Sequence, residues 1–329
     1  RDRNNSWILG DSGGFQIGKG VWEGDWKDPN CPKAHKKRDG VLRWMDEYMD
    51  YGMILDIPAW VSRSPAGQKA TGITSYQEAV NATRINNDYF MKNRSGACKF
   101  LNVLQGENHA DADDWYNQMK DYCDPKKYTD HFNGWSMGGQ NMCDIHLVLK
   151  RLVALRYDGL LEKGIHDVMH FLGTSKLEWA VLLTDIQRAV RKYHNENFTV
   201  TFDCASPFLA TANGQIYCEL ETENRQKWVY RMVPSIDDKN LSKDTTPFGQ
   251  AFVREGKHGS FLDSPITAEL MAKDICIYGP GDLNKIGKEG KTSWDSFSYA
   301  IMMGHNVWMH INAVQEANRQ YDNGVIPNM

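Results

Sequence analysis

The sequence predicts an α/β protein in which strands and helices alternate around a parallel sheet. Apolar, strand-like stretches recur at intervals of roughly 30 to 50 residues, with helical patterns between them, as in repeated βα units. Polar residues follow each strand directly, at the end where a (β/α)8 barrel builds its active site. The expected strand ends lie at residues 11, 56, 105, 138, 173 and 204. This pattern favours six consecutive strands of a (β/α)8 TIM barrel.

Composition and charge are those of an ordinary globular protein. The chain has 329 residues, of which 41% are hydrophobic and 24% charged, enough for one barrel-sized domain and an appendage. A net charge of −4 gives no overall basic field, so a nucleic-acid contact would have to come from local patches. Seven cysteines without a C-x-x-C pair indicate reduced thiols in the cytoplasm. No apolar run predicts a membrane helix, and no signal peptide is visible.

The first strand is expected at residues 7–10 and breaks into a glycine-rich turn at residues 11–16, where glycine lets the backbone approach a ligand closely. Residues 19–40 are expected to be irregular. Their basic run, residues 33–38, is most simply a solvated loop, and the alternative is a phosphate contact near the mouth of the site. An amphipathic helix follows, and its apolar face is made by Val41, Trp44, Met45, Tyr48 and Met49.

The other elements continue the alternation. The strand at residues 52–56 is stopped by Pro58, which leaves Asp56 as either a site residue or a turn residue. A capping box formed by Ser75 and Glu78 begins the next helix. Further helices and strands are expected at residues 75–90, 100–104, 113–122, 134–139, 145–153, 166–173, 179–193 and 200–204.

Asp203 stands at the carboxyl end of the last of these strands. A carboxylate at the carboxyl end of a strand stands where α/β proteins bind ligands, but the same residue could instead cap the next helix. His166 and His170 share one face of the preceding strand. Without the rest of a coordination set, they are more simply hydrogen-bonded polar residues than metal ligands. The Gln105 amide can both donate to and accept from the edge of a base.

The sequence resembles the tRNA-guanine transglycosylase superfamily through several motifs. Two of them are the string Asp11-Ser-Gly-Gly-Phe-Gln16 and the segment Asp203-Cys-Ala-Ser206 with Leu209, Ala210 and Tyr217. The sequence around Asp56 is similar to the archaeal members, which insert 7-cyano-7-deazaguanine, and residues 134–139 resemble the glycine-rich strand end of the family. The resemblance covers residues 11 to about 217 and then the last helix.

This resemblance implies a fold and a set of site residues. The family fold is a (β/α)8 barrel with two strands before the Asp-Ser-Gly-Gly strand, so we expect those two strands upstream of Arg1. Asp203 corresponds to the nucleophile that attacks the sugar C1′, and Asp11 to the second catalytic carboxylate. The residues expected to bind the base are Phe15, Asp56, Gln105, Gly134 and Leu172.

The accessory part of the chain departs from the family. The structural zinc site of the family needs three cysteines and a histidine, and here only Cys276 and His305 match, so we expect no zinc and no cofactor. The expected division is a catalytic core at 1–217, an accessory subdomain at 218–293 and a C-terminal helix at 294–329 that packs on the barrel. The accessory subdomain is either a nucleic-acid surface or an ordinary solvated one, and its interleaved basic and aromatic residues are Arg225, Lys227, Trp228, Tyr230 and Arg231.

These departures fit the DpdA-type relatives of phages and bacteria, which place 7-deazaguanines in DNA. The expected function is therefore that of a DNA-guanine transglycosylase, a pentosyltransferase that exchanges guanine for 7-cyano-7-deazaguanine or a derivative. The alternatives are a tRNA-guanine transglycosylase and a non-catalytic nucleic-acid-binding relative. The expected partners are DNA, or tRNA in the first alternative, and the free base, with no membrane. The expected location is the cytoplasm, that of the host if a phage encodes the chain, and homo-oligomer formation stays open.

Overall fold

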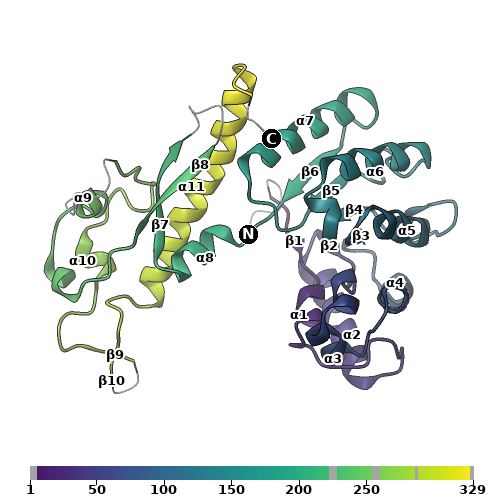
Figure 1. Ribbon diagram of the computed structural model, residues 1–329, viewed down its shortest axis with the longest axis horizontal. Helices are drawn as coiled ribbons and strands as arrows, with labels where there is room; N and C mark the ends of the chain where they lie inside the picture. The colour runs from purple at the N-terminus through teal and green to yellow at the C-terminus, as the bar shows by residue number, and fades with distance from the viewer. Residues whose placement is uncertain (1–5, 222–227, 254–259, 286–287, 327–329) are drawn as a thin grey trace. The chain divides into compact units, whose positions relative to one another are not determined.

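The structure, a computed structural model, describes residues 6–221, 228–253, 260–285 and 288–326. The chain divides into two compact units. The first contains Arg1–Thr174 with Ile186–Asp203, and the second contains Ser175–Asp185 with Cys204–Met329. Figure 1 labels the helices and strands of both units. Within the described ranges, no helix is both long enough and apolar enough to cross a membrane.

A six-stranded sheet forms the centre of the first unit. Its strands are β1 (Leu9–Gly10), β2 (Tyr51–Met53), β3 (Lys99–Leu104), β4 (Gly134–Met137), β5 (Val168–Phe171) and β6 (Thr199–Phe202). They lie in sequence order, and each pairs in parallel with the next. The register brings the carboxyl ends to one edge, since Leu104 pairs with Met137 and Phe171 with Phe202. The expected parallel α/β sheet is confirmed, as a curled half-barrel.

Helices connect these strands and flank the sheet (Figure 1). They are α1 (Gly14–Gly18), α2 (Pro32–Tyr48), α3 (Pro65–Thr71), α4 (Tyr76–Asn93), α5 (His109–Met119), α6 (Ile145–Tyr157) and α7 (Leu177–Tyr193), with 3₁₀ turns η1 (Ala59–Arg63), η2 (Lys120–Cys123) and η3 (Gly139–Met142). The Ser75 hydroxyl accepts from the Glu78 N–H at 3.2 Å, as the capping box predicts. The Glu78 carboxylate, however, accepts from the Thr74 N–H at 2.7 Å and not from that of Ser75.

Helix α2 begins earlier than expected. Residues 32–40 form its first half and not an irregular loop, because Pro32 in the first turn needs no N–H partner and the basic residues after it favour a helix. Val41 and Met45 are buried as expected, but Trp44 and Tyr48 are 45% and 49% exposed. The expected apolar face therefore divides into a core face and an exposed aromatic one.

Large aromatic side chains fill the space between the sheet and the helices. The indole N–H of Trp115 donates to the Val103 carbonyl at 3.0 Å, and that of Trp135 donates to the Leu160 carbonyl at 2.8 Å. Both rings are fully buried. Because each buried donor has a partner, these rings add apolar contact without an unpaired polar group and fix the positions of β3 and β4.

The second unit is built on an antiparallel strand pair and one long helix. Strands β7 (Gln215–Glu221) and β8 (Val229–Pro234) pair with each other, and α11 (Ser296–Asp322) packs against β7 and α8 (Ser206–Ala212). The Asn306 side chain links the three, since it accepts from the Tyr217 N–H at 2.9 Å and donates to the Thr211 hydroxyl at 2.9 Å. The smaller elements are η4 (Lys239–Lys243), α9 (Phe248–Val253), α10 (Ala272–Ile275), β9 (Leu283–Lys285) and β10 (Lys288–Glu289).

Two parts of the expected division of the chain can be compared with the second unit. The boundary expected between residues 217 and 218 falls inside β7, and residues 204–217 belong to the second unit. The expected C-terminal helix is present as α11. Its packing on the barrel stays a prediction, as do the expected domain boundaries.

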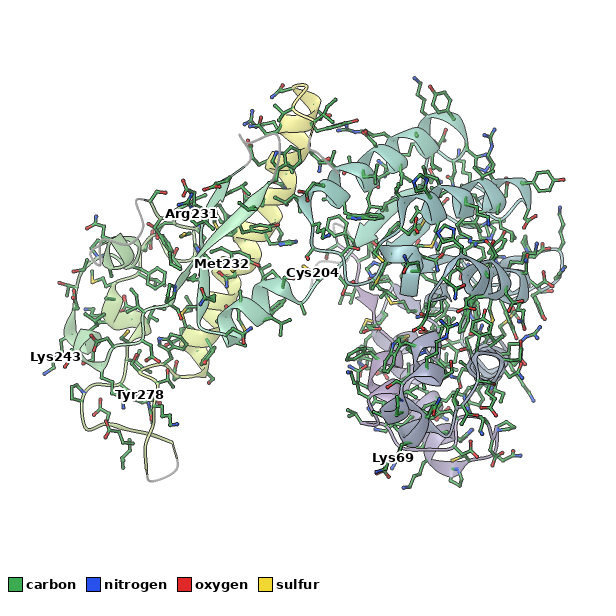
Figure 2. The ribbon with its side chains drawn as sticks, viewed as in Figure 1. Lys69, Cys204, Arg231, Met232, Lys243 and Tyr278 are labelled. Atoms are coloured by element: carbon green, nitrogen blue, oxygen red, sulfur yellow. The ribbon has the colours of Figure 1, made fainter. Side chains whose placement is uncertain are left out.

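The interleaved basic and aromatic residues of this unit are only partly exposed. Trp228 is buried, and Tyr230 stacks on Tyr217 with ring centroids 4.9 Å apart. Arg231, labelled in Figure 2, pairs with Glu219 at 3.3 Å and also with Glu221. Arg225 and Lys227 lie outside the described residues. The described members therefore serve the core and an ion-pair network, which weakens the interpretation of this stretch as a nucleic-acid surface.

Candidate active site

A cavity of about 390 Å³ opens between the two edge strands of the half-barrel. Asp11, just after β1, and Asp203, just after β6, both line it. The remaining lining residues are Trp7, Leu9, Met53, His170, Thr201 and Phe202. The curl of the sheet thus brings together the two carboxylates that the sequence singles out, from opposite ends of the first unit.

Asp203 is held by hydrogen bonds at the carboxyl end of β6. Its Oδ1 accepts from the Gly173 N–H at 3.0 Å and lies 3.1 Å from Nε2 of His170. Desolvation raises the pKa of the Asp203 carboxyl, but the hydrogen bonds from His170 and Gly173 outweigh it, so the pKa lies below its usual value. The side chain is 62% exposed. Asp203 is therefore an ionised and accessible carboxylate with a fixed orientation.

The contact between His170 and Asp203 is the feature of the site that sequence reasoning missed. The expectation that His170 is a hydrogen-bonded polar residue is confirmed, and Asp203 is one of its partners; 3% of the His170 side chain is exposed. Its Nδ1 lies 2.9 Å from the Thr201 hydroxyl, so the ring is held at both nitrogens. Nε2 is directed at Asp203, and the Thr201 hydroxyl is the partner of Nδ1. The signal was the strand register, in which His170 and Thr201 are direct neighbours.

Asp56 and Gln105 form a second polar pair at the same edge of the sheet. The Gln105 Nε2 donates to Asp56 Oδ2 at 2.8 Å, and the two residues are only 6% and 5% exposed. Burial raises the pKa of Asp56 to about 7; the Gln105 hydrogen bond opposes this shift, and the negative charge of Asp11 adds to it. The Asp11 charge therefore reaches both the cavity beside Asp203 and the buried pair.

Three glycines leave the space that this pair occupies. A Cβ on Gly14 would lie 2.6 Å from the Asp56 carbonyl oxygen, and one on Gly138 would lie 2.7 Å from Gln105 Nε2. Gly139 adopts φ +55° beside the Gln105 amide. The glycines after β1 and β4 are thus required for close packing around the Asp56–Gln105 pair.

The structure does not bring Gly134 to this group. Gly134 begins β4 and pairs with Val168, the first residue of β5, whereas the site residues follow the carboxyl ends of their strands. A Cβ on Gly134 would meet Val168 and Leu101, so its lack of a side chain serves strand packing. Gly138 and Gly139 stand at the place expected for Gly134.

Phe15 and Leu172 stand at the carboxyl-end side of the sheet. Phe15 in α1 is 58% exposed, and its ring centroid lies 6.1 Å from that of Trp60. The Lys19 ammonium is 5.3 Å from the Phe15 ring centroid. Leu172 follows β5, and its N–H donates to the Met137 carbonyl at 3.1 Å. The exposed Phe15 ring is free to contact a planar ligand.

No described residues form a group of three or more His, Cys, Asp or Glu side chains that could hold a metal. His305, the expected hydrogen-bonding histidine, has Nε2 2.7 Å from the Tyr217 carbonyl and Nδ1 3.3 Å from the Thr267 hydroxyl. Cys276 donates its S–H to the Ile236 carbonyl. Both residues are thus engaged within the fold of the second unit.

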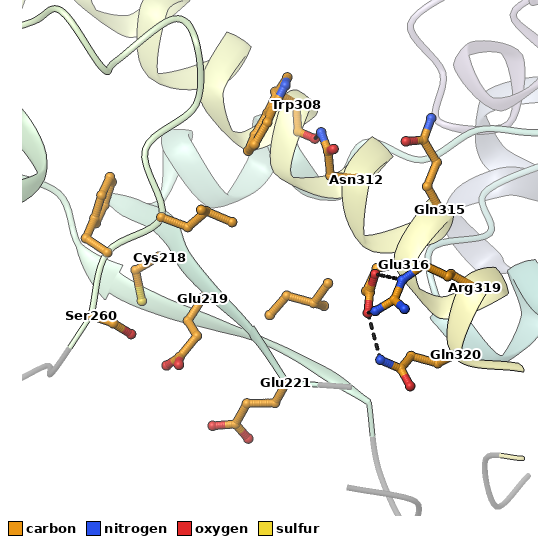
Figure 3. A pocket seen from close by; sticks show the side chains of 13 residues that line it. Cys218, Glu219, Glu221, Ser260, Trp308, Asn312, Gln315, Glu316, Arg319 and Gln320 are labelled. Atoms are coloured by element: carbon orange, nitrogen blue, oxygen red, sulfur yellow. Dashed lines mark hydrogen bonds and ion pairs between the residues drawn. The ribbon is translucent and has the colours of Figure 1, made fainter. Parts of the chain in front are cut away.

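The second unit has a cavity of its own, of about 1050 Å³, between β7 and α11 (Figure 3). None of the predicted site residues line it. Glu316 on its wall accepts from Arg319 at 2.5 and 2.7 Å and from Gln320 at 2.8 Å. Part of its charge is therefore already paired within the protein.

Comparison with known proteins gives no further guide to the site. The sequence matches no model of a known protein family, and it is not similar to any curated protein. The geometry of the residues themselves must therefore carry any functional conclusion.

Proposed function

We propose that this chain exchanges guanine in DNA for a 7-deazaguanine, through a covalent intermediate on Asp203. The observation that carries the proposal is the shared cavity of Asp11 and Asp203, in which Asp203 is ionised, exposed and hydrogen-bonded. A nucleophilic carboxylate needs these three properties, and a second carboxylate in the same cavity can move the proton that base exchange requires.

The exchange consists of two displacements at the sugar C1′. Asp203 attacks C1′ as the bond from C1′ to N9 of guanine breaks, through an oxocarbenium-like state similar to that of retaining glycosidases. The departing guanine takes a proton from solvent at N9 and leaves as the neutral base, and the solvent regains a proton from Asp11 after the second displacement. The incoming 7-deazaguanine loses its N9 proton to Asp11, attacks C1′ and releases the Asp203 carboxylate. Two inversions restore the β-linkage, and the proton count closes.

The Asp56–Gln105 pair is suited to read the edge of the base. A carboxylate accepts from both N1–H and the 2-amino group of guanine, and 7-deazaguanines share that edge. Gln105 holds the carboxylate in place, and Phe15 and Leu172 would contact the face of the base. The target nucleotide must leave its stack to reach such a site, at a cost of a few kcal/mol.

The proposal includes a complete (β/α)8 barrel. Strands β1 and β6 are the edges of the observed sheet, and residues from both line one cavity. Two further strands from an upstream segment would pair with both edges and close the barrel, which would also remove the unpaired edges.

The test is incubation with labelled guanine or 7-cyano-7-deazaguanine and either DNA or tRNA, followed by nucleoside analysis. Incorporation into DNA that Asp203→Ala abolishes would support the proposal. Incorporation into tRNA alone would replace it with a tRNA-guanine transglycosylase. Binding of both polymers without exchange of any base would leave a non-catalytic nucleic-acid-binding protein.

A further inference from the structure

A second cavity of the first unit, of about 520 Å³, lies on the other side of Asp11. Asp11 lines both this cavity and the one that contains Asp203. One wall is a face of α2, and the other comes from the turn after β1 and the loop that follows α1. The residues that decide its chemistry are Asp11, Gln16, Trp22, Lys36, Lys37 and Trp44.

Lys36 and Lys37 give this cavity two positive charges that no carboxylate of the described residues neutralises. Both are exposed, and within the described part of the chain no carboxylate lies within ion-pair distance of either. Their neighbour Lys33, in contrast, pairs with Glu23 at 2.9 Å. With Asp11 as the single carboxylate in the lining, the cavity carries a net charge of about +1, which suits an anionic group.

The same cavity offers an aromatic surface. Trp44 is 45% exposed although it belongs to a helix whose other face is buried, so its indole is available to a ligand. Trp22 packs closely against Gly13, where a Cβ would lie 2.5 Å from its ring, and the Lys37 ammonium lies 5.0 Å from the Trp22 ring centroid. An indole beside unpaired ammonium groups is the combination that binds single-stranded nucleic acid.

Gln16 adds an unmet hydrogen-bond acceptor. Its side-chain oxygen is buried and has no hydrogen-bond partner among the described residues. Such an oxygen is costly to leave unpaired, and an N–H donor of a bound ligand would satisfy it. The cavity thus combines sites for an anion, a planar ring and a polar N–H.

We propose that this cavity is the subsite for a nucleotide that flanks the target guanine. The phosphate of this nucleotide contacts Lys36 and Lys37, and its base stacks on Trp44. This inference rests on the proposed function, because the target sugar at Asp203 and the flanking nucleotide then lie on the two sides of Asp11. The sequence left two interpretations of the basic run at residues 33–38, a solvated loop and a phosphate contact. The proposed subsite favours the phosphate contact.

The first test removes the two charges. Lys36→Gln/Lys37→Gln should weaken binding of a labelled single-stranded oligonucleotide on the order of tenfold and lower the slope of log K against log salt by about 1.4, or 0.7 for each lost contact. The KM for the free base should not change, because the base binds on the other side of Asp11. Fluorescence anisotropy measures the binding independently of catalysis.

The matched control is Lys92→Gln/Lys126→Gln. Lys92 lies in the last turn of α4, before β3, and Lys126 precedes β4, so both lie toward the amino ends of the strands, away from the site. Both are exposed, as the cavity lysines are. This variant removes the same charge and should leave the affinity and the salt slope nearly unchanged. Equal effects of the two double variants would overturn the subsite.

The second test removes the aromatic surface. Trp44→Ala should weaken binding of the oligonucleotide by roughly 5- to 150-fold, the range expected for one base–aromatic stack. Trp44→Phe should restore most of the affinity. Tyr157→Ala is the control, since Tyr157 on α6 is 90% exposed. An unchanged affinity of Trp44→Ala would exclude stacking at this position.

The two proposals fail in different ways. Wild-type protein that binds the oligonucleotide through Lys36, Lys37 and Trp44 but exchanges no base would refute the transglycosylase and keep the nucleotide subsite. Base exchange that is indifferent to all three residues would refute the subsite and keep the enzyme. Oligonucleotides shortened on the 5′ or the 3′ side of the guanine then identify the flank, because one truncation should erase the difference between wild type and variant.

Discussion

Asp203 and Asp56 are the same residue type at the same edge of one sheet, yet their surroundings drive them to opposite states. Asp203 is exposed and accepts hydrogen bonds from His170 and Gly173, so its pKa is lowered. Asp56 is buried with a single amide partner, Gln105, and its pKa is raised to about 7. At Asp203 the hydrogen-bond donors lower the pKa more than desolvation raises it, whereas at Asp56 desolvation outweighs the hydrogen bond from Gln105.

Under the proposed function, this difference in charge state suits Asp203 and Asp56 to two different tasks in one site. A nucleophile must be charged before substrate arrives, whereas a residue that reads a base can wait for its charge until the base supplies N–H donors. Under the proposed function, Asp56 gains those donors only when guanine or a 7-deazaguanine binds. Under the proposed function, base binding at neutral pH should therefore release part of a proton from Asp56.

The largest effect is expected from replacing Asp203, the carboxylate with the lowered pKa. Asp203→Ala should lower the rate of base exchange by about 10⁴-fold or more, since loss of a covalent nucleophile removes the pathway itself. The unfolding midpoint should barely change, because the side chain is exposed. Asp203→Asn should also fail to form a covalent adduct with nucleic acid on denaturing gels. Turnover like that of the wild type in either variant would remove Asp203 from the mechanism.

The next largest effect is expected from replacing Asp56, the buried carboxylate. The wild type should prefer guanine over adenine by a factor on the order of 10³, because adenine has no N1 proton and no 2-amino group and would leave the carboxylate unpaired. Asp56→Ala should weaken the binding of guanine and of 7-deazaguanine alike and reduce the preference for guanine over adenine. Gln105→Ala should act in the same direction but more mildly, since a neutral amide loses less when unpaired. Unchanged base affinity and selectivity in Asp56→Ala would make Asp56 a turn residue only.

Much of this site could be predicted from sequence because it depends on where strands end. Asp11, Asp56, Gln105 and Asp203 each follow an apolar stretch, and parallel strands bring their carboxyl ends to one edge. Gly134 was expected from the resemblance and not from this reasoning, which puts the end of that strand at residue 138, close to where β4 ends at Met137. Gly134 begins β4, and the glycines that follow the strand are Gly138 and Gly139.

Other features required the three-dimensional structure. The contact between His170 and Asp203 depends on the register of β5 and β6 and on the direction of a side chain across strands. Lys36 and Lys37 line a cavity because α2 begins at Pro32, so the stretch expected to be a loop forms one wall of that cavity. Periodicity did not reveal that Trp44 lies outside the core, because an exposed indole and a buried one follow the same helical spacing.

The stability of the protein should report the raised pKa of Asp56. Between about pH 4 and about pH 7 the unfolded chain has lost the Asp56 proton and the folded chain retains it, so the wild type loses stability as pH rises, by up to about 4 kcal/mol. Asp56→Asn has no such proton. Relative to wild type, its free energy of unfolding in urea should therefore increase across this window. A difference that does not vary with pH would show that Asp56 is ionised in the folded protein.

The smallest expected effect tests the hydrogen bond that separates the two carboxylates. His170→Phe fills the buried space but removes the donor to Asp203, so the pKa of Asp203 should rise toward its usual value. Exchange should slow by roughly 10- to 100-fold, in the range of a lost charge-assisted hydrogen bond, and the acidic limb of the pH–rate profile should move to higher pH, because the nucleophile then needs a higher pH to ionise.

His166→Phe is the matched control for that change. His166 is buried just before the same strand, and its Nε2 lies 2.8 Å from the Cys123 carbonyl, so its hydrogen bonds serve the fold and not Asp203. This variant should lower the unfolding midpoint without moving the acidic limb. If neither variant moves the acidic limb of the pH–rate profile, His170 positions Asp203 but does not lower its pKa. The difference in pKa between Asp203 and Asp56 would then come from burial alone.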